Sequence, residues 1–176
     1  MLDRAARIWP RNSYILQGRI ATEARYGDPS VALRLLTDLH SRPGGNTDAE
    51  LADWRDFALA RQSGDKATHA KYESHVMADL AARRLSVGQA LVRATSLDDP
   101  DAAFFAASKA TPNDPTDTEQ FFRSPANKVR ADARFLPLMA KTGVLAYWWK
   151  TGRWADYCDA ADRPYDCRAV AAKLGF

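Results

Sequence analysis

The sequence has few of the residues that build common catalytic and metal sites. Its only histidines and cysteines are His40, His69, His75, Cys158 and Cys167. Their spacing matches no zinc-binding motif, and a structural zinc site needs about four ligands. The glycines form neither a phosphate-binding loop nor a dinucleotide-binding turn, and no serine lies in a nucleophile motif. We therefore predict that the chain is not an enzyme and that it holds no metal or cofactor.

Long apolar runs and an excess of one charge are absent as well. No apolar run approaches the roughly 20 residues of a membrane span, and the first residues do not resemble a signal peptide. The 25 basic and 22 acidic side chains leave a formal charge of +3, with no dense basic block. We predict that this chain has no membrane span and does not bind nucleic acid directly.

Helix-forming residues are abundant. Of the 176 residues, 46% are hydrophobic and 27% are charged, which is typical of a globular domain. Apolar and small residues recur at helical spacing, for example at Tyr14, Gly18 and Ala21. No segment shows the convincing alternation of a β-strand. The chain is therefore predicted to be all-α.

Three similar turns recur along the chain and mark helix starts. They contain Asp28, Asp65 and Asp99, which are 37 and 34 residues apart. Each aspartate can accept a hydrogen bond from a free backbone N–H at a helix start, and a proline follows two of them. Between these turns, three segments have the spacing of a capping box, and they are 47–50, 86–89 and 116–119.

The two series of helix starts divide the chain into short helices. We expect helices near 12–26, 29–41, 48–63, 66–84, 87–97, 100–110, 117–122, 126–142 and 144–151. A tetratricopeptide repeat is a helix pair of about 34 residues, and Gly18, Ala32, Leu36 and Pro43 resemble its consensus positions. The spacing from Gly18 to Ala32 is 14 residues, where the consensus has 12.

This resemblance implies a right-handed stack of antiparallel helix hairpins, a tetratricopeptide-like α-solenoid. Residues 1–123 would form the hairpins, and residues 124–176 would form capping helices and a tail of the same domain. The apolar face of the last repeat needs a cover. The predicted cap consists of the aromatic side chains of Tyr147, Trp148, Trp149, Trp154 and Tyr157, and an aromatic ligand cage is the alternative.

The segment 134–158 resembles the closing phrase of a bacterial tetratricopeptide family. The matching residues are Arg134, Phe135, Gly143, Tyr147, Trp148, Gly152, Arg153, Trp154, Asp156 and Cys158. Ala155 replaces the usual proline, and Tyr157 replaces a phenylalanine. In that family the arrays lie C-terminal to winged-helix transcriptional regulators, which are often membrane-anchored, and to class III adenylate cyclases.

The resemblance implies a non-catalytic protein-interaction or sensory domain, the C-terminal regulatory part of a larger bacterial regulator. The alternatives are the regulatory tail of a nucleotide cyclase and a purely structural or dimerising module. Residues 6–12 resemble the close of a repeat's second helix, so we expect a longer protein; an extra packing helix is the alternative. The domain would lie on the cytoplasmic or the periplasmic side of the inner membrane.

The expected partner is a protein or peptide, and a homodimer is a further candidate. In such an array the first helix of each hairpin lines a concave groove, which would present Asn12, Ile15, Arg19, Arg55 and Gln62. Polar and basic groups around an apolar one suit an extended peptide or its terminal carboxylate. The alternative is that these side chains are solvated and bind nothing.

The two cysteines lie close together in the sequence. Cys158 and Cys167 flank a turn at Arg163 and Pro164. In an oxidising compartment they would form a disulfide, and in the cytosol they would be two reduced thiols.

Overall fold

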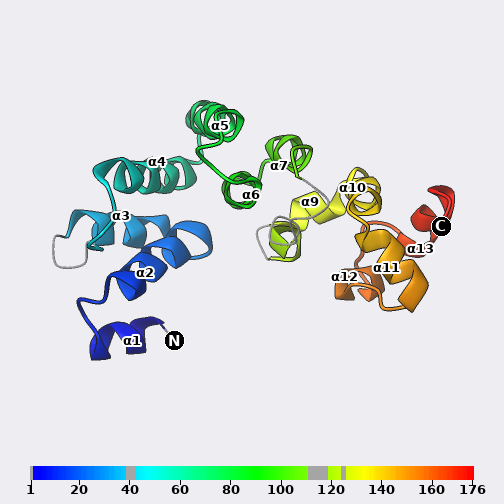
Figure 1. Cartoon of the computed structure of the whole chain (residues 1–176), viewed down its shortest axis with the longest axis horizontal. Helices are drawn as coiled ribbons and strands as arrows, with labels where there is room; N and C mark the ends of the chain where they lie inside the picture. Colours follow the sequence, from blue (N-terminus) through cyan, green and yellow to red (C-terminus); the bar gives the residue numbers. More distant parts are fainter. Residues whose placement is uncertain (1, 39–42, 111–118, 124–125) are drawn as a thin grey trace. The chain divides into compact units, whose positions relative to one another are not determined.

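The computed structural model describes residues 2–38, 43–110, 119–123 and 126–176, and its regular elements are helical (Figure 1). These residues form twelve α-helices and one 3-10 helix, without a β-strand in the described ranges. The all-α prediction is therefore confirmed. The chain divides into two compact units, Met1–Asp79 and Leu80–Phe176. The predicted grouping of residues 1–123 and 124–176 stays a prediction.

The first unit is built from consecutive helices that pack against one another. These are α1 (Leu2–Ile8), α2 (Ser13–Arg25), α3 (Pro29–Thr37), α4 (Asp48–Ser63) and most of α5 (Lys66–Ala81). The helix α1 contacts α2, α2 contacts α3 and α4, and α3 contacts α4. Phe57 of α4 stacks on Tyr72 of α5, with ring centroids 5.7 Å apart. One apolar residue from each of α2, α3 and α4 meets in a buried cluster of Ile20, Leu36 and Leu51.

The three aspartates lie at inter-helix turns, as predicted. Asp28 and Asp99 are the N-cap residues of α3 and α7, and Asp65 directly precedes α5. Each carboxylate accepts a hydrogen bond from a backbone N–H of the following helix, with O···N distances of 2.8, 3.0 and 2.8 Å. These bonds satisfy N–H groups that the first helical turn leaves without an intrahelical partner.

Two of the predicted capping boxes are formed in full. Thr47 and Glu50 exchange side-chain bonds with each other's backbone N–H, at 3.2 and 2.7 Å. Ser86 and Gln89 do the same at 3.1 and 2.9 Å. The third predicted box, 116–119, lies mostly outside the described residues.

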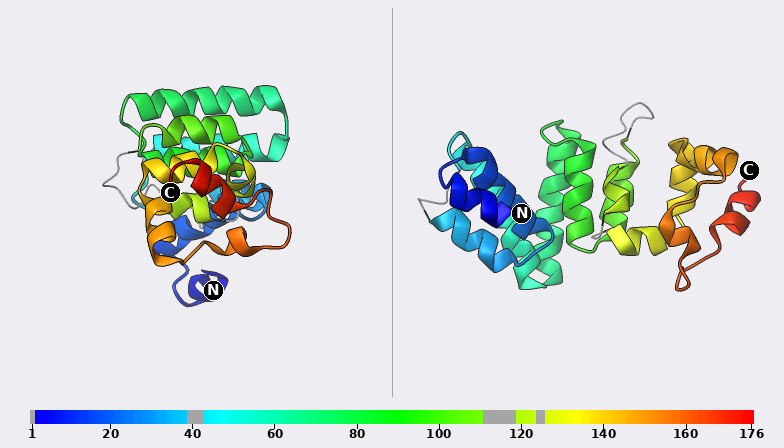
Figure 2. Two further views of the ribbon diagram at one scale, coloured as in Figure 1. Left: turned by 90° about the vertical axis from the view of Figure 1, so that its right-hand side faces the viewer. Right: turned by 90° about the horizontal axis from the view of Figure 1, so that it is seen from below.

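The second unit contains shorter helices than the sequence pattern predicts. It holds α6 (Val87–Ser96), α7 (Pro100–Ala107), η1 (Gln120–Phe122), α9 (Asn127–Ala131), α10 (Phe135–Lys141), α11 (Val144–Thr151), α12 (Asp156–Asp159) and α13 (Cys167–Lys173). The helix α6 contacts α7 and η1, and α9 contacts α7. The helix α10 contacts α9, α11 and α13, and it lies beside α11 in Figures 1 and 2.

The prediction of one helix over 126–142 is wrong, because the chain breaks between α9 and α10. At the break the Asp132 side chain accepts bonds from the backbone N–H and the guanidinium of Arg134. Such local side-chain bonds compete with the helical pattern. The helices α12 and α13 were not predicted, because each is too short to show several turns of apolar periodicity. The helix α1 lies where the sequence predicts the close of a helix before residue 12.

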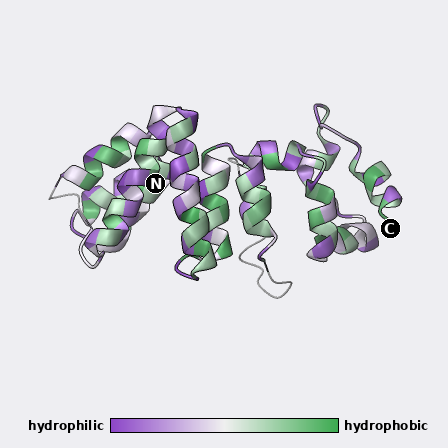
Figure 3. Cartoon of the chain, turned by 90° about the horizontal axis from the view of Figure 1, so that it is seen from above, coloured by the Kyte–Doolittle hydropathy of each residue, from purple (hydrophilic) through white to green (hydrophobic). Residues whose placement is uncertain are grey.

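The core of the second unit is rich in aromatic rings. Phe135 is fully buried, and its ring centroid lies 5.7 Å from that of Tyr157. Trp148 is 6% exposed, and its ring lies 6.1 Å from Trp154 and 6.3 Å from Tyr157. Figure 3 shows hydrophobic positions in green beside hydrophilic positions in purple on the same helices. These rings pack against one another, and their role as a cap on the last repeat stays a prediction.

Two glycines set the ends of α11. Gly143 and Gly152 have φ angles of 79° and 69°, in the left-handed region. Glycine adopts that conformation at little cost. Gly143 therefore separates α10 from α11, and Gly152 ends α11.

Candidate binding groove between α7 and α10

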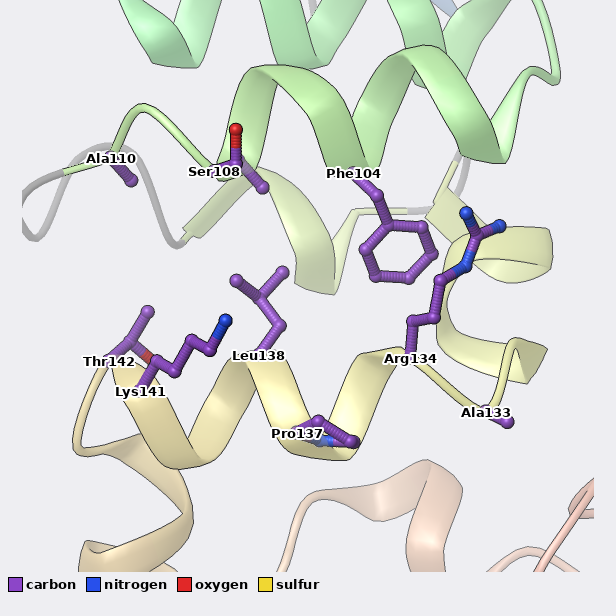
Figure 4. A pocket seen from close by; sticks show the side chains of 10 residues that line it. Phe104, Ser108, Ala110, Ala133, Arg134, Pro137, Leu138, Lys141 and Thr142 are labelled. Atoms are coloured by element: carbon purple, nitrogen blue, oxygen red, sulfur yellow. The ribbon is translucent and has the colours of Figure 1, made fainter.

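A groove with a volume of about 560 Å³ lies between α7 and α10 in the second unit (Figure 4). Its lining comprises Phe104, Ala107, Ser108, Ala110, Ala133, Arg134, Pro137, Leu138, Lys141 and Thr142. Phe104 and Arg134 lie at one end, and Ser108, Lys141 and Thr142 lie at the other. A volume of this size is within the range of about 300–1,000 Å³ that ligand pockets occupy.

The apolar surface of the groove comes from an excess of apolar residues on α10. This helix has five in succession, from Phe135 to Met139. Five consecutive residues point around the whole circumference of a helix and cannot all face one core. Phe135, Leu136 and Met139 are fully buried, whereas Pro137 and Leu138 remain partly exposed and line the groove.

At one end of the groove the positive charge is already compensated. The Arg134 guanidinium lies 2.6 Å from the Asp101 carboxylate and 2.7 Å from the Asp132 carboxylate. It also lies over the Phe104 ring, 4.4 Å from its centroid. Hydrogen bonds from Arg134 lower the pKa of the Asp132 carboxyl below its usual value. Arg134 therefore shapes this end of the groove and offers little free charge.

The other end carries a cation and two hydroxyl groups. Lys141 is the exposed last residue of α10, and it has no carboxylate partner among the described residues. The Ser108 hydroxyl donates to the carbonyl of Phe105 at 2.7 Å, and the Thr142 hydroxyl donates to the carbonyl of Met139 at 3.1 Å. Both hydroxyl oxygens can still accept a bond. This end therefore offers one charged donor and two neutral acceptors.

The five groove residues predicted from the sequence lie in the first unit and do not line the groove between α7 and α10. Some of them already bond to other residues of that unit. Asn12 caps α2 by accepting the Ile15 backbone N–H at 3.2 Å, and Ile15 is half-buried. Arg19 forms an ion pair with Asp3 of α1 at 3.2 Å. The polar groups of Asn12 and Arg19 therefore hold the local structure of α1 and α2.

The remaining two predicted residues, Arg55 and Gln62, are exposed on α4. Within the described residues, no hydrogen bond or ion pair joins either of them to Asn12 or Arg19. A binding role for the five residues stays a prediction.

Sequence reasoning missed Arg61, which is next to Gln62 and half-buried. Its Nη1 atom donates to the carbonyl oxygens of Glu23, Ala24 and Gly27, at 3.3, 2.9 and 3.2 Å. These carbonyls lie at the end of α2, where backbone acceptors lack intrahelical partners. Burial lowers the pKa of the Arg61 guanidinium. No local motif identifies this role, because the partner carbonyls are more than 30 residues away.

Cys158 and Cys167 form a disulfide in the structure, with their Cα atoms 5.6 Å apart. Both are buried, and the bond ties α12 to the start of α13. Tyr165, between them in sequence, donates its hydroxyl to the carbonyl of Arg130 at 2.6 Å. The segment after α12 is thereby attached to the body of the second unit at two points.

The described residues contain no group of three or more His, Cys, Asp or Glu side chains that could hold a metal ion. Over the same residues, no helix is long and apolar enough to cross a membrane. No protein-family model matches the chain, and no curated protein or solved structure matches it either.

Proposed function

We propose that this chain is a non-catalytic domain that binds a segment of a partner protein in the groove between α7 and α10. The observation that carries the proposal is the partly exposed apolar surface of Phe104, Pro137 and Leu138 in an open groove of about 560 Å³. Covering apolar surface is favourable by about 25 cal/mol per Å². An apolar side chain of a partner would therefore be stabilised there.

The chemistry of the lining supports binding rather than catalysis. Ser108 and Thr142 are its only hydroxyl residues, and both donate to backbone carbonyls. The lining holds no histidine or carboxylate that could act as a general base beside them. The described lining thus offers an apolar surface and two cations, Arg134, which is paired with carboxylates, and Lys141, which is not.

The resemblance of residues 134–158 supports a more specific proposal. The chain would be a tetratricopeptide-like stack of hairpins and the C-terminal regulatory part of a bacterial winged-helix regulator. The regulatory tail of a nucleotide cyclase and a dimerising module are the alternatives. Each would use the same groove for a protein segment, so the binding test below applies to all three.

The disulfide supports one of the two compartments that the resemblance implies. Disulfides persist in oxidising environments such as the bacterial periplasm, and Cys158 and Cys167 are paired in this fold. We propose the periplasmic side. Alkylation of the protein in its producing cells, before and after reduction, should label both thiols only after reduction. Equal labelling without reductant would contradict this placement.

A random peptide library displayed against the purified, oxidised chain tests the function. Leu138→Asp places a charge in the apolar part of the groove and should weaken binding of the enriched peptides at least tenfold. Leu174→Asp is the matched control, because Leu174 is 41% exposed and lies outside the groove lining. Circular dichroism would show that both variants are folded. Equal peptide affinity of the two variants, or no enrichment at all, would refute the proposed function.

A further inference from the structure

We infer that the groove selects an extended segment in which an apolar side chain lies against Leu138 and an aspartate or glutamate side chain pairs with Lys141. This inference rests on the proposed function and names the chemistry of its partner. It follows from the unequal charges at the two ends of the groove, from the direction of the two helices, and from the spacing of Leu138 and Lys141.

The charge of the groove is concentrated at the Lys141 end. The carboxylates of Asp101 and Asp132 lie within 2.7 Å of the Arg134 guanidinium, so its positive charge is already compensated and would not attract an anionic group of a partner. Lys141 is exposed and has no carboxylate partner among the described residues. Charge complementarity therefore favours an anionic group at Lys141 and disfavours one beside Arg134, where two carboxylates face one guanidinium.

The described backbone at the Lys141 end offers no site for a terminal carboxylate, so an anionic group there depends on the Lys141 ammonium. Both α7 and α10 end there, so the groove meets helix C-termini, where carbonyl groups predominate. The backbone N–H groups of Ser108 and Thr142 are already bonded to the carbonyls of Phe104 and Leu138. Capture of a chain terminus uses converging free N–H groups. A side-chain carboxylate needs only the Lys141 ammonium.

The spacing on α10 sets the spacing in the partner. Leu138 and Lys141 are three positions apart, which is about 4.5 Å along a helix. Residues i and i+2 of an extended segment lie on one face and about 6.6 Å apart. The flexible Lys141 side chain spans the difference. The expected motif is therefore an apolar residue and an acidic residue separated by one position, with backbone N–H groups facing the hydroxyl oxygens of Ser108 and Thr142.

The test is a double-mutant cycle on peptides enriched by the intact chain. Each peptide is made with its acidic residue and with the matching amide, and each is measured against the unaltered chain, Lys141→Gln and the control Lys150→Gln. Lys150 is an exposed lysine on α11 outside the groove lining. Lys141→Gln should weaken the acidic peptide about 3–10-fold and leave the amide peptide within about twofold. Lys150→Gln should change neither.

The outcomes separate the inference from the proposed function. If the coupling between Lys141 and the acidic residue of the peptide is below about twofold while Leu138→Asp still loses binding, the acidic-segment inference is wrong and the proposed groove function is retained. Loss of affinity when the peptide C-terminus is amidated would also overturn it, in favour of a terminal carboxylate. If the enriched peptides bind Leu138→Asp as well as the unaltered chain, the proposed function falls and the inference falls with it.

Discussion

Replacing Trp148 with alanine tests whether the aromatic cluster is the core of the second unit. Trp148 is 6% exposed, and its ring lies 6.0–6.3 Å from the rings of Phe122, Trp154 and Tyr157. Truncating a buried aromatic side chain to alanine costs about 3–5 kcal/mol, because apolar burial is lost and a cavity remains. We expect Trp148→Ala to lower the free energy of unfolding by this amount, which is a large share of the roughly 5–15 kcal/mol that stabilises a typical domain.

The adjacent tryptophan provides a matched control on the same helix. Trp149 is 44% exposed, and its ring lies 6.2 Å from that of Trp154. A ring pair of this kind contributes about 0.5–1.5 kcal/mol beyond its buried area, and the buried part of the ring adds to this. Trp149→Ala should therefore cost about 2 kcal/mol, less than Trp148→Ala. Urea unfolding of the oxidised chain, followed by circular dichroism at 222 nm, measures both. With a slope near 2 kcal/mol per M, the Trp148→Ala midpoint should fall by about 1.5–2.5 M.

Two results would refute this reasoning. A cost below about 1 kcal/mol for Trp148→Ala would show that the ring is not part of a packed core, and simultaneous loss of peptide binding would favour an aromatic ligand cage. Equal costs for Trp148→Ala and Trp149→Ala would show that the phase of α11 is wrong.

Two further predictions concern backbone groups that side chains satisfy. Arg61→Met should lower the free energy of unfolding by about 1.5–3 kcal/mol, because it removes the hydrogen bonds from a charged donor to three carbonyls. In the same urea assay, Arg55→Met, at an exposed position, should change the free energy of unfolding by less than about 0.5 kcal/mol. Similar losses in the two variants would contradict the role assigned to Arg61. The cap bonds of Asp28 and Asp65, to Ser30 and Thr68 respectively, lower the pKa values of their carboxyls. The stability that the two ionised carboxylates contribute is therefore complete above the pKa of an aspartate in the unfolded chain. It is lost as the pH falls through the lowered pKa of the folded protein, so the free energy of unfolding should decline below about pH 4. The double variant Asp28→Asn, Asp65→Asn keeps an oxygen acceptor at each cap but removes the titrating carboxyl groups. Its urea midpoint should therefore fall less steeply than that of the unaltered chain between pH 6 and pH 2. An equally steep fall would contradict the assignment of the pH dependence to these two caps.

The helix starts could be predicted because their chemistry is local. A cap needs a side-chain oxygen two or three residues before a backbone N–H, so Asp28, Asp65 and Asp99 can be identified from a few neighbouring residues. The two capping boxes follow for the same reason. The break between α9 and α10 is also local, but the apolar pattern runs across it, and the bonds of Asp132 to Arg134 decide the outcome.

The buried face of α2 could not be predicted, because it depends on distant neighbours. Tyr14 lies on the predicted stripe with Gly18 and Ala21, yet it is 84% exposed, whereas Leu16 and Ile20 are buried. The helix has contacts on more than one side. A Cβ atom added at Gly18 would lie 3.6 Å from the Leu2 side chain, so Gly18 faces α1, while Ile20 belongs to the cluster with α3 and α4. Small residues mark a close approach of helices but do not tell which helix approaches.

The candidate groove was missed because it joins two helices about 30 residues apart, with no spacing rule between them. The sequence analysis placed the binding residues in the first unit because it expected the first helix of each hairpin to line the groove. A usable indication was nevertheless present at Phe135–Met139. Five consecutive apolar residues exceed what one face of a helix can bury, so some of them must meet either a second layer of the protein or a partner. The structure buries Phe135, Leu136 and Met139 on one side and leaves Leu138 beside Phe104 on the other. A sequence search for functional surfaces on helical domains should therefore examine apolar runs that are too long for one face, and not only the polar residues around a presumed groove.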